Sequence, residues 1–174
     1  MSQIVYQEAL DPYHAAFRIL RLRALAPVDL ILPVDHVRIL DFYMVFPFRL
    51  AEYKFRQEHV RFRKALKIYD DVQPYGALPD DQNLLSRMQP MQMAALATLA
   101  RQGFIDQDAL DRGLVARTEA EPGAELSERI AMLNAEHPIL VEVLTALMTA
   151  YKTVGPDGIK RRSSLIEHRY DAVV

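Results

Sequence analysis

Residues 40–50 read LDFYMVFPFRL and carry the strongest indication of fold class in this chain. The side chains are mostly large and apolar, and Asp41 is the only charged residue between Ile39 and Phe46. A helix that is apolar on nearly all sides is either central in its domain or covered by another surface. Pro47 disfavours a helical conformation at Phe46, so the helix should end there. Two interpretations are open: a central core helix, or a helix that is half core and half docking surface.

Composition limits the possibilities for the whole chain. It has 174 residues, 51% of them hydrophobic, so we expect one core and a single domain over 1–174. The net charge of −2 provides no overall attraction to nucleic acid or anionic lipid. The absence of cysteine excludes disulfides, thiolate zinc sites and a cysteine nucleophile. There is no signal-peptide pattern and no run of roughly 18 uncharged apolar residues, so we expect a cytoplasmic protein without membrane contact.

Charge is distributed unevenly along the chain. Residues 49–67 contain seven basic and two acidic side chains, whereas residues 106–136 contain eight acidic and three basic ones. The simpler interpretation is that the two segments pair with each other or are solvated. In the alternative, the basic segment and three basic residues near the end of the chain contact DNA or an acidic partner. These candidate contacts are Arg56, Arg61, Arg63, Lys64, Lys67, Lys160, Arg161 and Arg162.

Proline and aspartate mark the helix boundaries in the N-terminal part. Asp11 and Pro12 are typical of the start of a helix, and Pro27 ends it. Pro33 then begins a second helix, which contains residues 40–50. The arginines of the first helix are expected outside its apolar stripe. The side chains expected in that stripe are Tyr13, Phe17, Leu20 and Leu25.

Residues 55–69 have the spacing of a third helix, because large side chains recur every three or four positions. Residues 70–83 are rich in Pro, Gly and Asp, which favour turns over regular structure. They are the best candidate for an internal boundary, joining an N-terminal helical subdomain (1–70) to a second subdomain (84–174). The recurring side chains of the third helix are Phe55, His59, Phe62, Leu66 and Tyr69.

Residues 89–123 follow the order of elements of a winged-helix unit. We expect a helix, a glycine turn, a short helix and then a possible short hairpin that begins with LVART (114–118). The predicted fold class is therefore mainly α, α+β at most: a compact multi-helix domain with a winged-helix-like unit and at most one short hairpin. The residues expected to start and stop these two helices are Pro90, Gly103, Asp106 and Gly113.

Two further helices are expected nearer the C-terminus. Ser127 is the expected cap of the first, and Pro138 begins the second, which is strongly amphipathic. Residues 159–174 lack the polar, low-complexity character of a disordered terminus. We therefore expect this tail to be docked, either on its own domain or on a partner.

The sequence contains little that indicates catalysis. Its five histidines are scattered singly, and there is no phosphate-binding loop or nucleophile elbow. Asp157 and Glu167 loosely resemble the carboxylates of a metal-dependent nuclease, but an arginine, Arg169, stands where a lysine is usual. A turn followed by a surface segment is the simpler interpretation. We expect no catalytic residue, no metal site and no cofactor.

Four stretches occur in an order that is similar to one known group of proteins. They are DPYHAAFRILRL (11–22), RILDFYMVFPF (38–48), QPYGALPDDQNLLSRMQPMQMAALATLARQGFID (73–106) and GPDGIKRRSSLIEHRYD (155–171). On these strings the chain resembles the middle component of bacterial three-component ABC-ATPase systems. This broad class includes Lamassu-type phage defence.

The resemblance implies a protein that is not itself the enzyme. In such systems an SMC-like ABC ATPase acts with an effector, often a nuclease, and the middle component is thought to bridge the two. Winged-helix-like elements are suspected in it. A buried Asp41 that pairs with Arg169 would explain both residues without a partner. The residues in the matching strings that would contact a partner are Asp41, Phe42, Tyr43, Phe46, Pro47, Arg169, Tyr170 and Asp171.

Three functions follow as hypotheses. The leading one is a non-enzymatic adaptor that links an SMC-like ABC ATPase to an effector in anti-phage or anti-plasmid defence, with DNA contact inside the complex. The alternative is a stand-alone winged-helix DNA-binding regulator, which predicts salt-dependent binding to duplex DNA. A hydrolase has the least support, because it rests on Asp157 and Glu167 alone.

Overall fold

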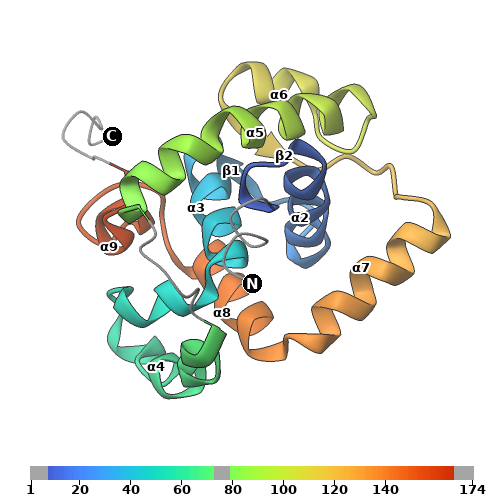
Figure 1. Ribbon diagram of the computed structural model, residues 1–174. Helices are drawn as coiled ribbons and strands as arrows, with labels where there is room; N and C mark the ends of the chain where they lie inside the picture. The colour runs from blue at the N-terminus through green and yellow to red at the C-terminus, as the bar shows by residue number, and fades with distance from the viewer. Residues whose placement is uncertain (1–7, 73–78, 167–174) are drawn as a thin grey trace.

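Helix α3 (Val34–Val45) lies at the centre of the protein, in contact with helices on several sides (Figure 1). The computed structural model describes residues 8–72 and 79–166. Around α3 pack α2 (Pro12–Leu25), α5 (Asp81–Arg101), α8 (Pro138–Ala150) and α9 (Ile159–Ser163). The predicted mainly helical class is therefore confirmed, and the second helix begins after Pro33 and ends before Pro47 as expected.

Helix α2 starts as predicted but buries a different face. The Asp11 carboxylate accepts hydrogen bonds from the backbone N–H groups of Tyr13 (2.7 Å) and His14 (3.0 Å). Tyr13, however, is 84% exposed, whereas Arg18 and Arg23 are both only 7% exposed. The predicted stripe is wrong at these positions because both arginines find internal acceptors, a carboxylate for Arg18 and backbone carbonyls for Arg23.

The expected third helix is replaced by a series of short turns. They are η2 (Gln57–His59), α4 (Phe62–Ala65) and η3 (Leu66–Val72), and a further turn, η1 (Pro47–Glu52), precedes them. The predicted apolar side chains are nevertheless buried, and His59 alone of the set is only half-buried. Tight turns bring the aromatic rings into contact, for example Tyr53 with Phe55 at a centroid distance of 4.8 Å. Ring packing in the core thus takes precedence over helical regularity here.

Helix α5 begins nine residues earlier than predicted. Asp80 caps it, accepting a hydrogen bond from the Asn83 N–H at 3.0 Å, and the helix continues through Pro90. Pro90 is tolerated because it lies on the exposed side, where water can bond the carbonyl it leaves free. Gly103 ends the helical segment with φ +81°, as expected. Residues 73–78 of the predicted connector lie outside the described residues.

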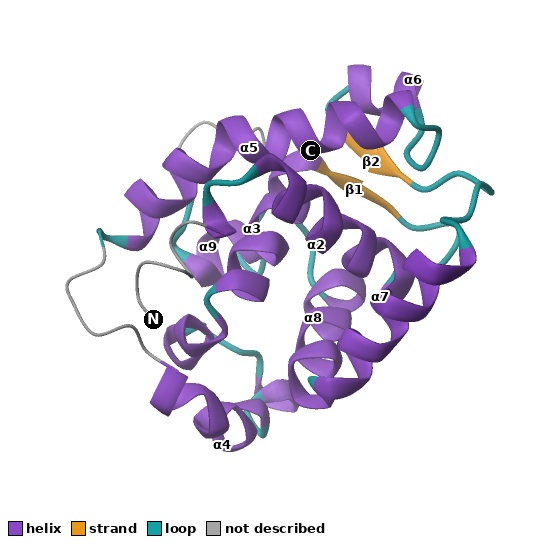
Figure 2. Ribbon diagram, turned by 45° about the vertical axis from the view of Figure 1, so that its right-hand side comes forward, coloured by secondary structure: helices purple, strands orange, loops and turns teal. Residues whose placement is uncertain are grey.

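The predicted hairpin after residue 113 is wrong. Strand β2 (Leu114–Ala116) follows α6 (Gln107–Asp111) and pairs antiparallel with β1 (Ile31–Pro33), far upstream, with Leu32 opposite Val115. Figure 2 shows the two strands side by side near α6. The helix–glycine–helix–strand order is therefore present. However, β2 pairs with the upstream strand β1 and not with a strand that follows it in a hairpin.

Helix α7 (Ala124–Glu136) lies at the edge of the molecule (Figures 1 and 2). Its N-cap is Gly123, so the predicted cap at Ser127 is wrong; the Ser127 hydroxyl donates instead to the Pro122 carbonyl at 3.0 Å. Only Ile130 of α7 is buried. Helix α8 starts at Pro138 as expected, bent by 100° from α7, and carries five buried side chains into the core.

Candidate functional site

The residues predicted as a docking surface on α3 lie in the core. Asp41, Phe42 and Phe46 are 0% exposed and Tyr43 is 2% exposed. The rings of Phe42 and Tyr43 meet edge to face at 5.5 Å. A partner could reach these side chains only if the fold opened, so the structure favours the core interpretation of residues 40–50. Arg169, Tyr170 and Asp171 lie outside the described residues.

Asp41 pairs with Arg18, whereas the predicted partner Arg169 lies outside the described residues. The Arg18 Nε donates to one carboxylate oxygen at 2.6 Å and its Nη2 to the other at 3.2 Å. The Gln92 side chain donates to the same carboxylate at 2.9 Å. Arg38 then connects Gln92 to Asp35, with its Nε 3.1 Å from the Gln92 Oε1. This buried network joins α2, α3 and α5. Because its bonds link side chains of three packed helices, its role is structural.

The exposed basic residues gather around α4. Arg61, Arg63, Lys64 and Lys67 are all exposed, and we call them the basic surface. Arg61 forms an ion pair with Glu142 at 2.6 Å, but both side chains are more than half exposed, so the pair is weak. No ion pair joins 49–67 to the acidic segment 106–136, both of which the structure describes in full. The interpretation that these segments pair with each other is therefore wrong.

The fold brings α9 beside residues 53–56, close to the basic surface. The Lys54 N–H donates to the Arg162 carbonyl at 3.2 Å, and the Arg162 Nη1 donates to the Lys54 carbonyl at 2.5 Å. Arg161 is exposed on α9. Helix α9, which carries the predicted basic residues near the C-terminus, thus lies on the same side of the molecule as α4 (Figure 1).

Three of the predicted basic contacts have internal roles. The guanidinium groups of Arg56 and Arg162 lie 4.4 and 5.8 Å from the centre of the Tyr151 ring. Lys160 is 7% exposed and forms an ion pair with Asp35 at 2.9 Å. Burial would raise the pKa of Asp35, but the bonds and charges of Lys160 and Arg38 lower it overall. These three cations hold α9 and the turns around Tyr151 in place.

Sequence reasoning missed a groove between α2 and α7, which we call the α2–α7 groove. Its volume is about 580 Å³. Phe17 from α2 faces Arg129 from α7, whose guanidinium lies 5.5 Å from the ring centre. The Arg21 Nε donates to the Asn134 Oδ1 at 2.9 Å and ties the two helices together. The feature of the sequence that could have indicated the groove is the segment of α7, which has too few apolar side chains for the helix to be fully buried. The groove is lined by Glu8, Tyr13, His14, Phe17, Arg18, Arg21, Met44, Val45, Leu126, Arg129 and Leu133.

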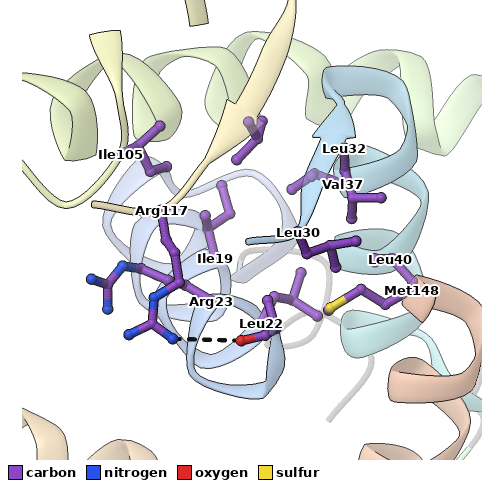
Figure 3. A pocket seen from close by; sticks show the side chains of 12 residues that line it. Ile19, Leu22, Arg23, Leu30, Leu32, Val37, Leu40, Ile105, Arg117 and Met148 are labelled. Atoms are coloured by element: carbon purple, nitrogen blue, oxygen red, sulfur yellow. Dashed lines mark hydrogen bonds between the residues drawn. The ribbon is translucent and has the colours of Figure 1, made fainter. Parts of the chain in front are cut away.

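A second cavity lies under the two strands (Figure 3). Its volume is about 40 Å³, room for a water molecule or a methyl group but not for a substrate. Leu30, Leu32 and Val37 line it, and Arg117 lies at its edge with Nη1 3.5 Å from the Ala26 carbonyl. We interpret this cavity as a packing defect between the sheet and α2.

The chemical groups singled out in the sequence are held by internal contacts. In the described ranges, no three His, Cys, Asp or Glu side chains are grouped so as to hold a metal ion. Asp157 pairs with Arg162, whose hydrogen bond lowers the pKa of this carboxyl, and Glu167 lies outside the described residues. Within 8–72 and 79–166 no single helix could span a membrane; α7 and α8 pass on length and composition only as a bent pair.

His36 is the most deeply buried of the described histidines. Its Nε2 donates to the Leu147 carbonyl at 3.0 Å, and its Nδ1 lies 2.9 Å from the Thr153 hydroxyl, which therefore donates to it. Burial lowers the pKa of His36 to about 4, only partly opposed by the bond to Leu147. The imidazole is thus neutral and connects α3 to α8 and to the turn that follows it.

The fold and these surfaces define a mainly helical protein with one continuous core and two candidate binding surfaces, the basic surface and the α2–α7 groove. Residues 4–171 match the ABC-three component (ABC-3C) system Middle Component 5, and the chain belongs to this family. The predicted resemblance to a middle component is thus confirmed, and its partners are other components of such a system. Comparison with curated proteins and with solved structures gives no match.

Proposed function

We propose that this protein is a non-enzymatic, cytoplasmic adaptor that links the ABC ATPase of its three-component system to an effector. The ATPase is SMC-like in this proposal, the effector is a nuclease, and the system acts in Lamassu-type defence against phages or plasmids. Family membership over residues 4–171 is the observation that carries the proposal. The role of the adaptor is to keep the effector inactive until the ATPase senses foreign DNA.

The placement of the two candidate surfaces supports an adaptor. A protein that bridges two partners needs two surfaces that can be occupied at the same time. Helix α4, around which the basic surface lies, and helix α7, one wall of the α2–α7 groove, are on different sides of the molecule (Figure 1). The buried side chains of His36 and Asp41 are used in internal hydrogen bonds that stabilise the scaffold.

The experiment is co-expression of this protein with the other two components of its system, followed by size-exclusion chromatography. We expect a complex that contains all three chains, and less association of ATPase with effector when this protein is left out. A monomer that elutes apart from both components would contradict the proposal. ATPase and effector that associate equally well without this protein would contradict it too.

The alternative function, a stand-alone winged-helix DNA-binding regulator, is favoured by one observation. Arg63, Lys64 and Lys67 are exposed and form no ion pair with any described residue. This function predicts that the isolated protein binds a 30-base-pair duplex and loses affinity steeply between 50 and 200 mM salt, by roughly a factor of ten or more.

Charge reversal separates the alternative from the adaptor. Glutamate at Arg61, Arg63 and Lys64 should abolish duplex binding and leave the circular dichroism spectrum unchanged, because these side chains are exposed. Arg112→Glu, an exposed arginine after α6, is the matched control. Duplex binding that survives the triple reversal would exclude the basic surface as the DNA contact.

A further inference from the structure

The α2–α7 groove has the shape and lining of a site for a helix. Apolar side chains come from both walls and from the end of α3, and Tyr13 stands at the groove 84% exposed. Exposed tyrosine beside an apolar groove is typical of surfaces that bind other proteins. The apolar lining residues are Tyr13, Phe17, Met44, Val45, Leu126 and Leu133.

The groove also carries two arginines that form no ion pair with a described carboxylate. The guanidinium of Arg21 bonds two uncharged acceptors, the Asn134 Oδ1 at 2.9 Å and the Leu133 carbonyl at 3.4 Å. Arg129 lies over the Phe17 ring, which holds the guanidinium at the groove, and its N–H groups donate to no acceptor among the described residues. Neither arginine forms an ion pair with a carboxylate of residues 8–72 or 79–166.

The other charges near the groove offset this pair only in part, and Glu136 of α7 acts on Arg21 from beyond ion-pair distance. Arg18 is neutralised by Asp41, its partner in the core. Glu8 contributes one negative charge, and it lies at the end of the groove where the described chain begins. Two unpaired guanidinium groups beside an apolar lining therefore call for an occupant with both apolar side chains and carboxylates.

The dimensions favour a helix, and the charges disfavour a second copy of this chain. Helix α7 has 13 residues, and a helix of that size is about 20 Å long, enough to lie beside an amphipathic helix of roughly three turns. A second copy docked through the same face would bring two grooves that both carry these arginines together, and like charges repel.

We propose that the α2–α7 groove binds an amphipathic helix from another component of the three-component system, with its apolar face on Tyr13, Phe17 and Leu133 and its carboxylates on Arg21 and Arg129. This inference rests on the proposed adaptor function. It assigns one of the two partner contacts to the groove and leaves the basic surface for the other.

Two exposed substitutions test the groove in the full-length protein. Dissociation constants are measured against each of the other two purified components by biolayer interferometry. We expect Arg129→Glu and Tyr13→Ala each to raise the Kd for one component about tenfold or more, because the charge pair and the aromatic contact are lost. The effect of Arg129→Glu should shrink at high salt.

Matched controls on other surfaces make the result specific. Arg112→Glu changes an exposed arginine after α6, and Val28→Ala changes an apolar side chain that is 72% exposed. Both should change the Kd by less than about twofold, as expected for substitutions outside the contact. All four variants should keep the thermal unfolding midpoint of the wild type. Groove variants that bind both components as the wild type does would overturn the inference while the adaptor function stands. Wild-type protein that binds neither component would remove the adaptor function itself.

Photo-crosslinking identifies the occupant. With p-benzoylphenylalanine in place of Tyr13, irradiation of the reconstituted complex should crosslink this protein to an acidic amphipathic segment of another component. Mass spectrometry of the crosslinked peptide gives its sequence. A crosslink to a second copy of this chain, to its own residues 1–7, or to a basic segment of a partner would overturn the inference.

Discussion

Asp41 shows how a single residue in an apolar stretch reveals a structural role. It is the only charge between Ile39 and Phe46, and the core accepts it because both carboxylate oxygens are bonded, by Arg18 and by Gln92. Burial of a carboxylate without such partners would cost several kcal/mol. The Asp41 carboxylate thus specifies how α2, α3 and α5 pack together. Because its oxygens are bonded inside the protein, it is not available to a partner.

We predict that Asp41→Asn lowers the free energy of unfolding by about 3–5 kcal/mol, because Arg18 would keep its buried charge without a counter-ion. Chemical denaturation monitored by circular dichroism measures the change. The control is Asp157→Asn, which breaks the pair with the partly buried Arg162 from an Asp157 side chain that is 71% exposed, and should cost less than about 1 kcal/mol. Equal effects of the two substitutions would contradict the structural role of Asp41.

His36 predicts a pH dependence of stability. Its pKa is about 4 in the folded protein against 6.5 in the unfolded chain, so the unfolded chain binds more protons between these values. The contribution of His36 is complete above pH 6.5 and is lost as the pH falls to 4, a change of about 3 kcal/mol.

The measurement is the free energy of unfolding from urea titrations at pH 4.5, 5.5 and 7. Wild type should lose stability more steeply toward low pH than His36→Gln, in which an amide replaces the imidazole and does not titrate. Parallel curves for the two proteins would show that His36 does not take up a proton on unfolding.

At the scale of elements, periodicity predicted which side chains are buried better than which backbone carries them. Phe55, Phe62, Leu66 and Tyr69 are in the core as their spacing indicates, yet the segment consists of 3-10 turns and a single short α-helix. Spacing of three and four is compatible with both kinds of turn, because i and i+3 side chains meet on one side of either. The contact of His59 with Tyr151, the residue that follows α8, favours the tighter geometry.

Pro90 is the clearest case in which a local rule is overridden. Proline usually marks the first turn of a helix, and here it lies inside α5 because Asp80 supplies a better cap upstream. We predict that Pro90→Ala raises the free energy of unfolding by about 2 kcal/mol, since the backbone hydrogen bond is restored at an exposed position.

Differential scanning calorimetry should show a rise in Tm of about 4–8 °C for Pro90→Ala. The reciprocal control is Ala94→Pro, one turn further along the exposed side of α5, which should cost about 3 kcal/mol. A loss of stability with Pro90→Ala would show that the proline ring itself contributes packing.

At the scale of the whole molecule, one core joins the parts before and after residues 70–83. Helix α2 packs on α5, and α3 contacts α8 and α9 as well. Buried residues from both sides of the predicted boundary therefore belong to one hydrophobic cluster.

We predict that the protein unfolds as a single cooperative unit. Denaturation curves followed by far-ultraviolet circular dichroism and by tyrosine fluorescence should coincide, because the helices and the tyrosines of the core belong to one cluster. Two separate transitions would instead support independent subdomains at 1–70 and 84–174.

The sequence by itself determined the helical class, most caps, the left-handed glycines Gly103 and Gly113, and the family to which the chain belongs. These features depend on local chemistry: an aspartate that accepts backbone N–H bonds, or a glycine with positive φ, acts on residues close by. Only the tertiary structure decided that Asp41 pairs with Arg18, that β2 pairs with β1, and that α7 leaves a groove beside α2. Each of these depends on segments far apart in the chain, and the spacing of residues along one segment does not specify which distant segment will cover it.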